Sequence, residues 1–191
     1  GTAAKTAQVN TVTPANVAAG NTFTVTINAK SLTFTALSSD ATVKGVCAGL
    51  ASMIAGSTEP EFQEVSVRDM TTLIRLTAKT PGKPFTQTSS AAGGTATNTT
   101  ATATASAGPN DWSTAANWSG GAVPVNSDEV FAETTVDILY GLAQSAVTLT
   151  SLNIAAEFTS KIGLPEYNAA GYKEYRDKTL AIGSTTTRIG Y

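Results

Sequence analysis

Threonine alternates with alanine or another small residue over a long stretch in the middle of this chain. The pattern is clearest from residue 95 to residue 105, which read Thr-Ala-Thr-Asn-Thr-Thr-Ala-Thr-Ala-Thr-Ala. β-Branched side chains favour extended backbone, and their hydroxyl groups form hydrogen bonds with nearby backbone groups. The pattern therefore predicts a β-rich chain with a chemically inert surface, and it favours a structural role over an enzymatic one.

The composition excludes several kinds of chemistry. The 191 residues include no histidine and one cysteine, Cys47, and 14% of them are charged, with a net charge of −2. A Ser-His-Asp triad, histidine metal ligands and an intrachain disulfide are therefore excluded. Nucleic-acid binding needs a basic cluster, and a membrane helix needs an apolar run of about 20 residues; the sequence shows neither. We expect no enzyme activity and no catalytic, metal or cofactor-binding residues.

Residues 1–90 predict an N-terminal α+β domain with the order β-β-α-β-β. Alternating apolar residues in 22–28 and 32–36, joined by a short polar turn, predict a hairpin. After a helical segment, two more strands are expected in 64–68 and 74–78. Short connections favour antiparallel pairing, so the helix is expected to cover one face of a small sheet.

The helical segment is indicated by apolar residues at helical spacing. They are Val43, Val46, Cys47, Leu50 and Ile54. Asp40 is expected to cap the start of this helix and Gly56 to end it. Because Cys47 lies on the apolar face, it is expected to be buried and unreactive.

Residues 91–108 are predicted to form a Thr/Ala-rich extended connector. Their content of Ser, Gly and Ala also fits a flexible linker. Threonine at every second position, with one slip at Thr99 and Thr100, favours ordered extended backbone with a β-bulge instead.

Residues 109–191 predict an all-β module, because short β-type runs recur between Gly, Pro and Asn residues. A sandwich and a stack of solenoid coils both fit this pattern. The final segment, from 185 to 191, has the composition of a strand with an unpaired edge. Such an edge is expected to pair either with a partner or with further polypeptide. The predicted fold is therefore mainly β with one helix.

Two segments resemble parts of known virion proteins. Residues 19–28 (Ala-Gly-Asn-Thr-Phe-Thr-Val-Thr-Ile-Asn), a helix at 41–55 and the segment 72–86 resemble a small domain that recurs in tailed-bacteriophage particles. A Trp-x-x-Ala-x-x-Trp-x-x-Gly-x-x-Pro pattern, from Trp112 to Pro124, resembles the start of β-solenoids in phage and bacterial surface proteins. The first resemblance brings no catalytic residues, and the second implies that the indole rings cap the β-stack.

Three groups of residues are candidate binding or interaction sites. Trp112 and Trp118 are interpreted as the structural cap, with stacking on a glycan as the alternative. A carboxylate group is interpreted as solvated surface, with a calcium site or an acid/base pair as alternatives; it consists of Asp128, Glu129, Glu133 and Asp137. An aromatic and basic group is a candidate protein interface, with an ordinary surface loop as the alternative; it consists of Tyr167, Tyr172, Tyr175, Arg176 and Tyr191.

These observations predict a non-enzymatic structural protein of a bacteriophage particle. Capsid decoration (cement) or the base of a head or tail fibre is expected, through β-edge and loop contacts with phage capsid or tail proteins. A homo-oligomer is expected, and the resemblance implies a trimer located in the virion. The alternative is a bacterial cell-surface adhesin or carbohydrate-binding module. A glycoside-processing enzyme is the least favoured class.

Overall fold

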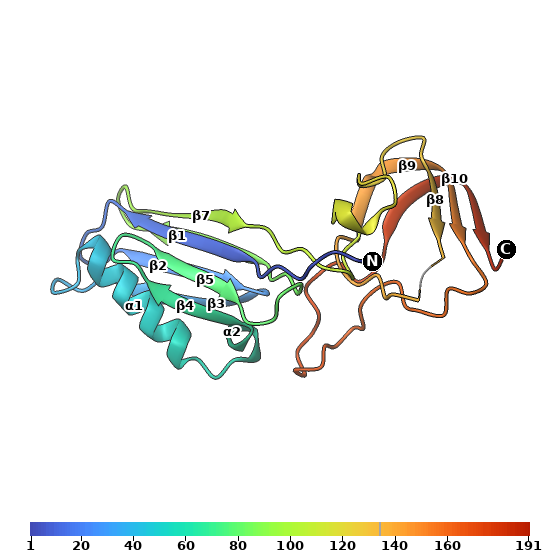
Figure 1. The fold of residues 1–191 in the computed structure, drawn as a ribbon. Coiled ribbons are helices and arrows are strands. Elements are labelled where there is room, and N and C mark those ends of the chain that lie inside the picture. Colours follow the sequence, from blue (N-terminus) through green and yellow to red (C-terminus); the bar gives the residue numbers. More distant parts are fainter. Residues whose placement is uncertain (134) are drawn as a thin grey trace.

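The chain forms two groups of β-strands, and the computed structural model describes residues 1–133 and 135–191 (Figure 1). Each group surrounds its own cluster of buried apolar side chains. One long helix accompanies the first group, and the described strands do not close into a barrel. The prediction of a mainly β fold with one helix is confirmed.

The first unit consists of two antiparallel sheets, where the sequence predicted one. One sheet has the order β4-β5-β1-β7 and is formed by β1 (Val9–Ala15), β4 (Val65–Asp69), β5 (Ile74–Ala78) and β7 (Thr97–Thr104). The other has the order β3-β2-β6 and is formed by β2 (Thr22–Ile27), β3 (Lys30–Thr35) and β6 (Gln87–Ala92). The predicted hairpin is the β2–β3 pair, in which Phe23 lies opposite Phe34.

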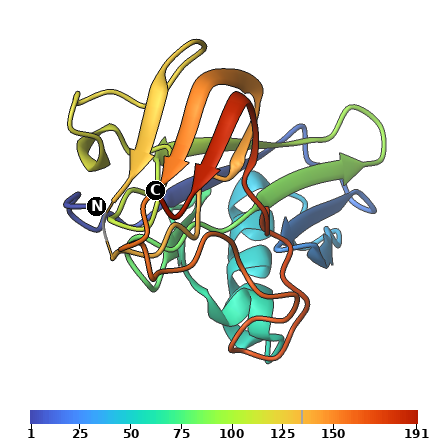
Figure 2. The ribbon, with the colours of Figure 1, turned by 90° about the vertical axis from the view of Figure 1, so that its right-hand side faces the viewer.

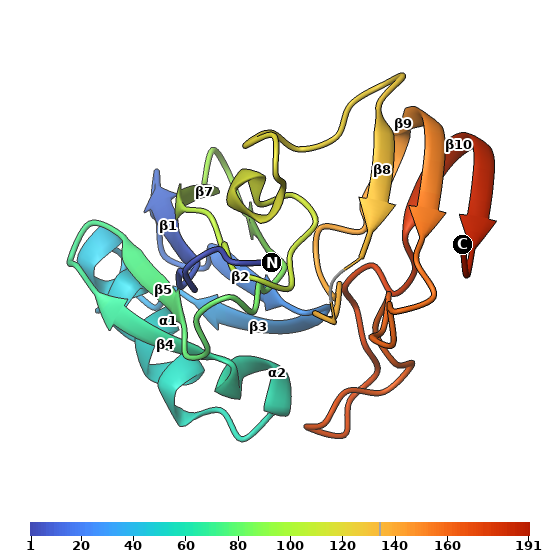
Figure 3. The same ribbon diagram turned by 45° about the vertical axis from the view of Figure 1, so that its right-hand side comes forward.

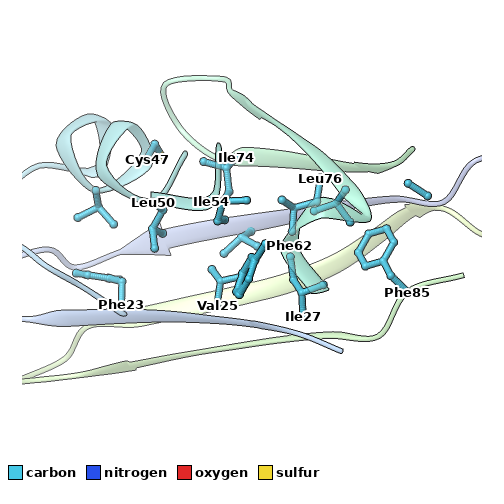
Figure 4. Packing of buried hydrophobic residues seen from close by; sticks show 14 of the residues in the cluster. Phe23, Val25, Ile27, Cys47, Leu50, Ile54, Phe62, Ile74, Leu76 and Phe85 are labelled. Carbon is cyan, nitrogen blue, oxygen red and sulfur yellow. The ribbon is translucent and has the colours of Figure 1, made fainter. Parts of the chain in front are cut away.

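The core of the first unit lies between these two sheets (Figure 4). Side chains from both sheets are fully excluded from solvent, among them Val12, Phe23, Val25, Ile27, Ile74 and Leu76. In β2 the inward positions are apolar and the outward positions are threonines, as a strand with one buried face requires. Thr24 and Thr33 share a hydrogen bond of 2.8 Å across the outer face, so the hydroxyl surface satisfies itself locally.

Helix α1 (Val43–Gly56) packs along the side of the unit where β3 and β4 are the outer strands. Its buried residues are Val46, Cys47, Leu50 and Ile54, which confirms the predicted apolar face and the burial of Cys47. The helix begins after Thr42, whose hydroxyl accepts a hydrogen bond of 3.0 Å from the Gly45 amide. The prediction of Asp40 as the cap was therefore wrong. A short helix, α2 (Pro60–Gln63), follows.

The Thr/Ala-rich segment is an ordered part of the first unit. After β6 the chain turns and returns as β7, which pairs antiparallel with β1 from Ala15↔Thr97 to Val9↔Thr104. The irregularity in this pairing lies opposite Val9 and Asn10, near the end of β7, and not at the predicted slip. The extended backbone predicted for 91–108 is present in 97–104. It forms the outer strand of a sheet, so most of the predicted connector belongs to the first unit, and residues 105–108 lead from there to the second unit.

The second unit contains three parallel strands in the order β10-β9-β8 (Figures 2 and 3). They are β8 (Glu129–Ala132), β9 (Ala143–Ile154) and β10 (Ala181–Ile189), preceded by the 3-10 turn η1 (Ala115–Asn117). A separate parallel bridge joins Ile138, which follows β8, to Ile162, which follows β9. Strands that return in register after each turn of the chain are typical of solenoid coils, so the structure favours the solenoid alternative over the sandwich.

Candidate interaction sites

A buried charge cluster joins the two units. The loop between Gly163 and β10 extends from the second unit to the first, and its Arg176 lies in contact with the segments around β4 and Pro84. The guanidinium group donates to a Glu64 carboxylate oxygen, to Glu174 Oε1 at 2.7 Å and, through Nε, to the Pro84 carbonyl at 2.6 Å. Lys83 also pairs with Glu64. We call this group, together with Asn28 and Tyr172, the junction.

Asn28 and Tyr172 complete the junction beside the ion pairs. The Asn28 amide donates to Glu64 Oε2 at 3.0 Å and to the Tyr172 hydroxyl at 3.1 Å. Asn28 is in a left-handed backbone conformation with φ 48°, at the turn between β2 and β3. Asparagine tolerates this conformation. The tight turn therefore places the Asn28 side chain within hydrogen-bonding distance of Tyr172, on the loop of the second unit.

The charges of the junction stabilise one another. Burial would raise the pKa of Glu64, but hydrogen bonds from Lys83 and Tyr172 and the charge of Arg176 outweigh it and lower that pKa below its usual value. Burial would lower the pKa of Arg176, yet Glu64 and Glu174 raise it. For Tyr172, burial and then the nearby Glu64 both raise the pKa. The junction therefore holds Glu64 ionised and Tyr172 as a neutral donor.

The five residues of the candidate protein interface differ in their exposure to solvent. Tyr172 and Arg176 are buried inside the junction, at 7% and 8% exposure, so they bind another part of the same chain and are not available to an external partner. That part of the prediction is corrected. Tyr167, Tyr175 and Tyr191 are exposed. Tyr175 stacks on Tyr172 at 6.4 Å, whereas Tyr191 packs edge-on against Phe131 at 6.1 Å, on the parallel sheet.

The two tryptophans lie against the apolar core of the second unit. Trp112 is 2% exposed and packs with Val130, Leu149 and Leu152. Trp118 meets it in a T-shaped contact with ring centroids 4.7 Å apart, and its Nε1 donates to the Trp112 carbonyl at 2.8 Å. Trp112 is therefore part of the buried core of the second unit and presents no free ring face. Trp118 is half-buried and lines two adjoining hollows.

The four predicted carboxylates, Asp128, Glu129, Glu133 and Asp137, have different surroundings. Asp128 accepts a hydrogen bond from the Val125 amide at 2.9 Å, and Asp137 accepts one from the Lys161 amide at 2.9 Å. Glu129 and Glu133 are exposed, and Glu133 accepts a hydrogen bond from the Tyr191 hydroxyl at 3.2 Å. Within residues 1–133 and 135–191, no three His, Cys, Asp or Glu side chains are grouped to hold a metal ion.

Sequence reasoning missed most of the junction. Glu64, Lys83, Asn28 and Glu174 were not singled out, because they lie far apart in the chain and each is a common surface residue type. Comparison with protein-family models gave no match, and comparison with curated proteins gave none either. Among the helices of the described residues, none is long and apolar enough to cross a membrane.

Proposed function

We propose that the chain is a non-enzymatic structural component of a bacteriophage particle. Its place would be that of a capsid decoration (cement) protein or of the base of a head or tail fibre. The resemblance of residues 19–28 and 72–86 to a virion domain supports this proposal. In the structure these residues form β2, β5 and the segment leading toward β6, which frame the core of the first unit.

The junction is the observation that carries the proposal. A protein that braces a particle must transmit force between its parts without bending, and interdomain contacts are usually mobile unless they are extensive or strongly bonded. Here Arg176 is buried between two carboxylates and a backbone carbonyl, and each of its three nitrogens has an acceptor. A buried ion pair with an acceptor at each guanidinium nitrogen opposes relative motion, so we expect the two units to behave as one rigid body.

The outer strand β10 supports assembly with neighbouring subunits. Its Ile189 lies beside Ile154, and Ile154 lies beside Ala132, so the three side chains share one face of the sheet. Ile154 and Ala132 are partly covered, whereas Ile189 is 77% exposed. An exposed strand edge with an apolar side chain favours pairing with another β-strand, either of further polypeptide or of a partner, and we propose the partner. A homo-oligomer, with a trimer implied by resemblance, and contacts with capsid or tail proteins form part of the proposal.

Mass spectrometry of purified particles tests the proposal. Cells that carry the gene are induced, the released particles are banded in a density gradient, and their proteins are digested. Peptides of this chain that stay with the particle through a high-salt wash would support the proposal. Their presence only in the soluble or cell-wall fraction would overturn it.

The second candidate function is a bacterial adhesin or carbohydrate-binding module. One observation favours it: Trp118 borders hollows that also contain Phe131 and Glu133. Recovery of the chain from the bacterial cell wall, and not from particles, is the result expected for this candidate.

A further inference from the structure

Two adjoining hollows on the second unit have a lining that the proposed structural role does not use. The smaller has a volume of about 200 Å³ and is lined by Asp111, Trp112, Trp118, Phe131, Glu133 and Phe158, together with Gly1 and with polar and aliphatic residues such as Asn117, Ser119 and Ile138. The larger, of about 550 Å³, shares Trp118, Phe131 and Glu133 and adds Asp128 and Glu129. We call the pair the aromatic groove. Apolar concavities with a few convergent polar groups are typical of ligand sites.

The aromatic groove presents apolar ring surface that is already fixed in place. Trp118 is held by its contact with Trp112 and by its hydrogen bond to the Trp112 carbonyl. Phe131 lies on β8 with 49% of its surface exposed, and it packs against Tyr191. A flat apolar ligand face can therefore be covered without ordering new side chains, which lowers the entropic cost of binding.

The aromatic groove also offers both acceptors and a donor. Asp111 is buried and Glu133 is exposed, and both carboxylates line the smaller hollow. Ser119 lines both hollows, and its side chain is exposed, so its hydroxyl group can donate a hydrogen bond to a ligand.

The lining discriminates between ligand classes. Four carboxylates border the aromatic groove, against the amino group of Gly1 and no Lys or Arg side chain of the described residues, so the negative charge prevails and anionic ligands are disfavoured. A cation would pair with the carboxylates and with the aromatic faces, but it would leave the donor capacity of the Ser119 hydroxyl unused. Sugar hydroxyl groups both donate and accept hydrogen bonds, and the C–H face of a pyranose ring is apolar. A neutral sugar satisfies all three features.

We propose that the aromatic groove binds a neutral saccharide. One ring lies in the smaller hollow against Trp118 and Phe131, with its hydroxyl groups donating to Asp111 and Glu133 and accepting from Ser119. The larger hollow holds the adjoining residue of an oligosaccharide. The proposal does not depend on a place in the virion, because it is argued from the lining of the aromatic groove alone.

Tryptophan fluorescence tests the proposal directly, because the two tryptophans of the chain are both at the aromatic groove. The full chain is first applied to an array of neutral oligosaccharides built from hexoses and N-acetylhexosamines, with sialylated and sulfated glycans alongside. The strongest ligand is then titrated while the emission is recorded. We expect binding of neutral glycans and a change in tryptophan emission that saturates with the ligand.

Two groove variants and one matched control complete the test. Phe131→Ala and Glu133→Gln, both at exposed positions, are expected to weaken the affinity at least tenfold while the melting temperature stays within a few degrees of wild type. Tyr167→Ala, which removes an exposed ring outside the aromatic groove, is expected to bind like wild type. Three results would overturn the proposal: no neutral glycan retained by the folded protein, binding that leaves the emission and the variants unaffected, or a preference for anionic glycans or basic peptides.

Discussion

Arg176 shows at the residue scale how a polar side chain fixes the relative position of the two units. Its charge is removed from water, which is costly unless the charge is paired and each nitrogen has an acceptor. Glu64, Glu174 and the Pro84 carbonyl supply those partners. Two of the three lie on the first unit and one on the second, so separating the units would break the ion pair with Glu64 and the hydrogen bond to Pro84.

The first prediction concerns Arg176→Ala. Removing one partner of a buried ion pair costs about 3–5 kcal/mol, because the remaining charges stay buried without compensation. We expect a loss of this order in the free energy of unfolding measured in urea. Arg75→Ala is the matched control, since Arg75 is exposed on β5, and it should change stability by less than about 0.5 kcal/mol. Equal effects of the two substitutions would show that the junction adds nothing to stability.

The second prediction concerns the pH dependence contributed by Glu64. Its pKa in the folded protein lies below the usual 4.5, so its ionised form is favoured by folding. The contribution is therefore fully present above about pH 4.5 and is lost as the pH falls through the folded value. We expect wild type to exceed Glu64→Gln in stability at pH 7 and the difference to shrink at pH 3. The same substitution at the exposed Glu129 should give almost no difference at either pH. A gap for Glu64→Gln that is unchanged at pH 3 would contradict the assignment.

At the scale of elements, the position of α1 depends on a close approach to β3. A Cβ atom added at Gly49 would lie 2.1 Å from the Phe34 ring, whereas one added at Gly56, the last helical residue, would meet no atom within 4 Å. Glycine at position 49 therefore allows the helix to contact the ring of the outer strand, although glycine weakens a helix.

The third prediction follows from this contact. Gly49→Ala gains up to about 1 kcal/mol of helix propensity, but crowding in a packed core costs about 1–3 kcal/mol. We expect a net fall in the melting temperature, which Phe34→Leu should partly reverse in the double variant. Gly56→Ala should leave the melting temperature unchanged or raise it slightly. A stabilised Gly49→Ala variant would show that α1 does not pack against β3 as described.

The elements also show which features the sequence could predict. The β2–β3 hairpin and α1 have buried positions that are all apolar, so their periodicity is visible. Strand β1 was missed because its buried positions are Asn10, Val12 and Pro14, of which one is an ordinary core residue. Asn10 is buried because its amide donates to Gln87 Oε1 at 3.0 Å, a partner that local sequence does not reveal.

The junction could not be predicted from the sequence for the same physical reason. Tyr172, Glu174 and Arg176 are buried and alternate with exposed Lys173 and Tyr175, which is the periodicity of a strand. Because the buried positions carry charged and polar groups, hydropathy does not detect this alternation. Their partners lie on the other unit, more distant in sequence than any local pattern extends. By contrast, the tryptophan pattern was recognisable because its spacing is local.

At the scale of the whole molecule, we infer that the junction holds the two β-units as one rigid body. The proposed structural role depends on this rigidity. The second unit is parallel and solenoid-like, the first is a two-layered antiparallel unit, and each has its own core. Separate cores would normally permit relative motion. The loop that carries Tyr172 and Arg176 opposes that motion at a point where both units contribute charge.

The most direct test is the distribution of distances between spin labels on the two units. In a Cys47→Ala background, labels at the exposed positions Lys44 on α1 and Glu157 after β9 are measured by pulsed electron resonance. We predict one narrow distance peak for the intact junction and a broad distribution for Arg176→Ala, with Arg75→Ala remaining narrow. A broad distribution that is the same with and without Arg176 would contradict the account.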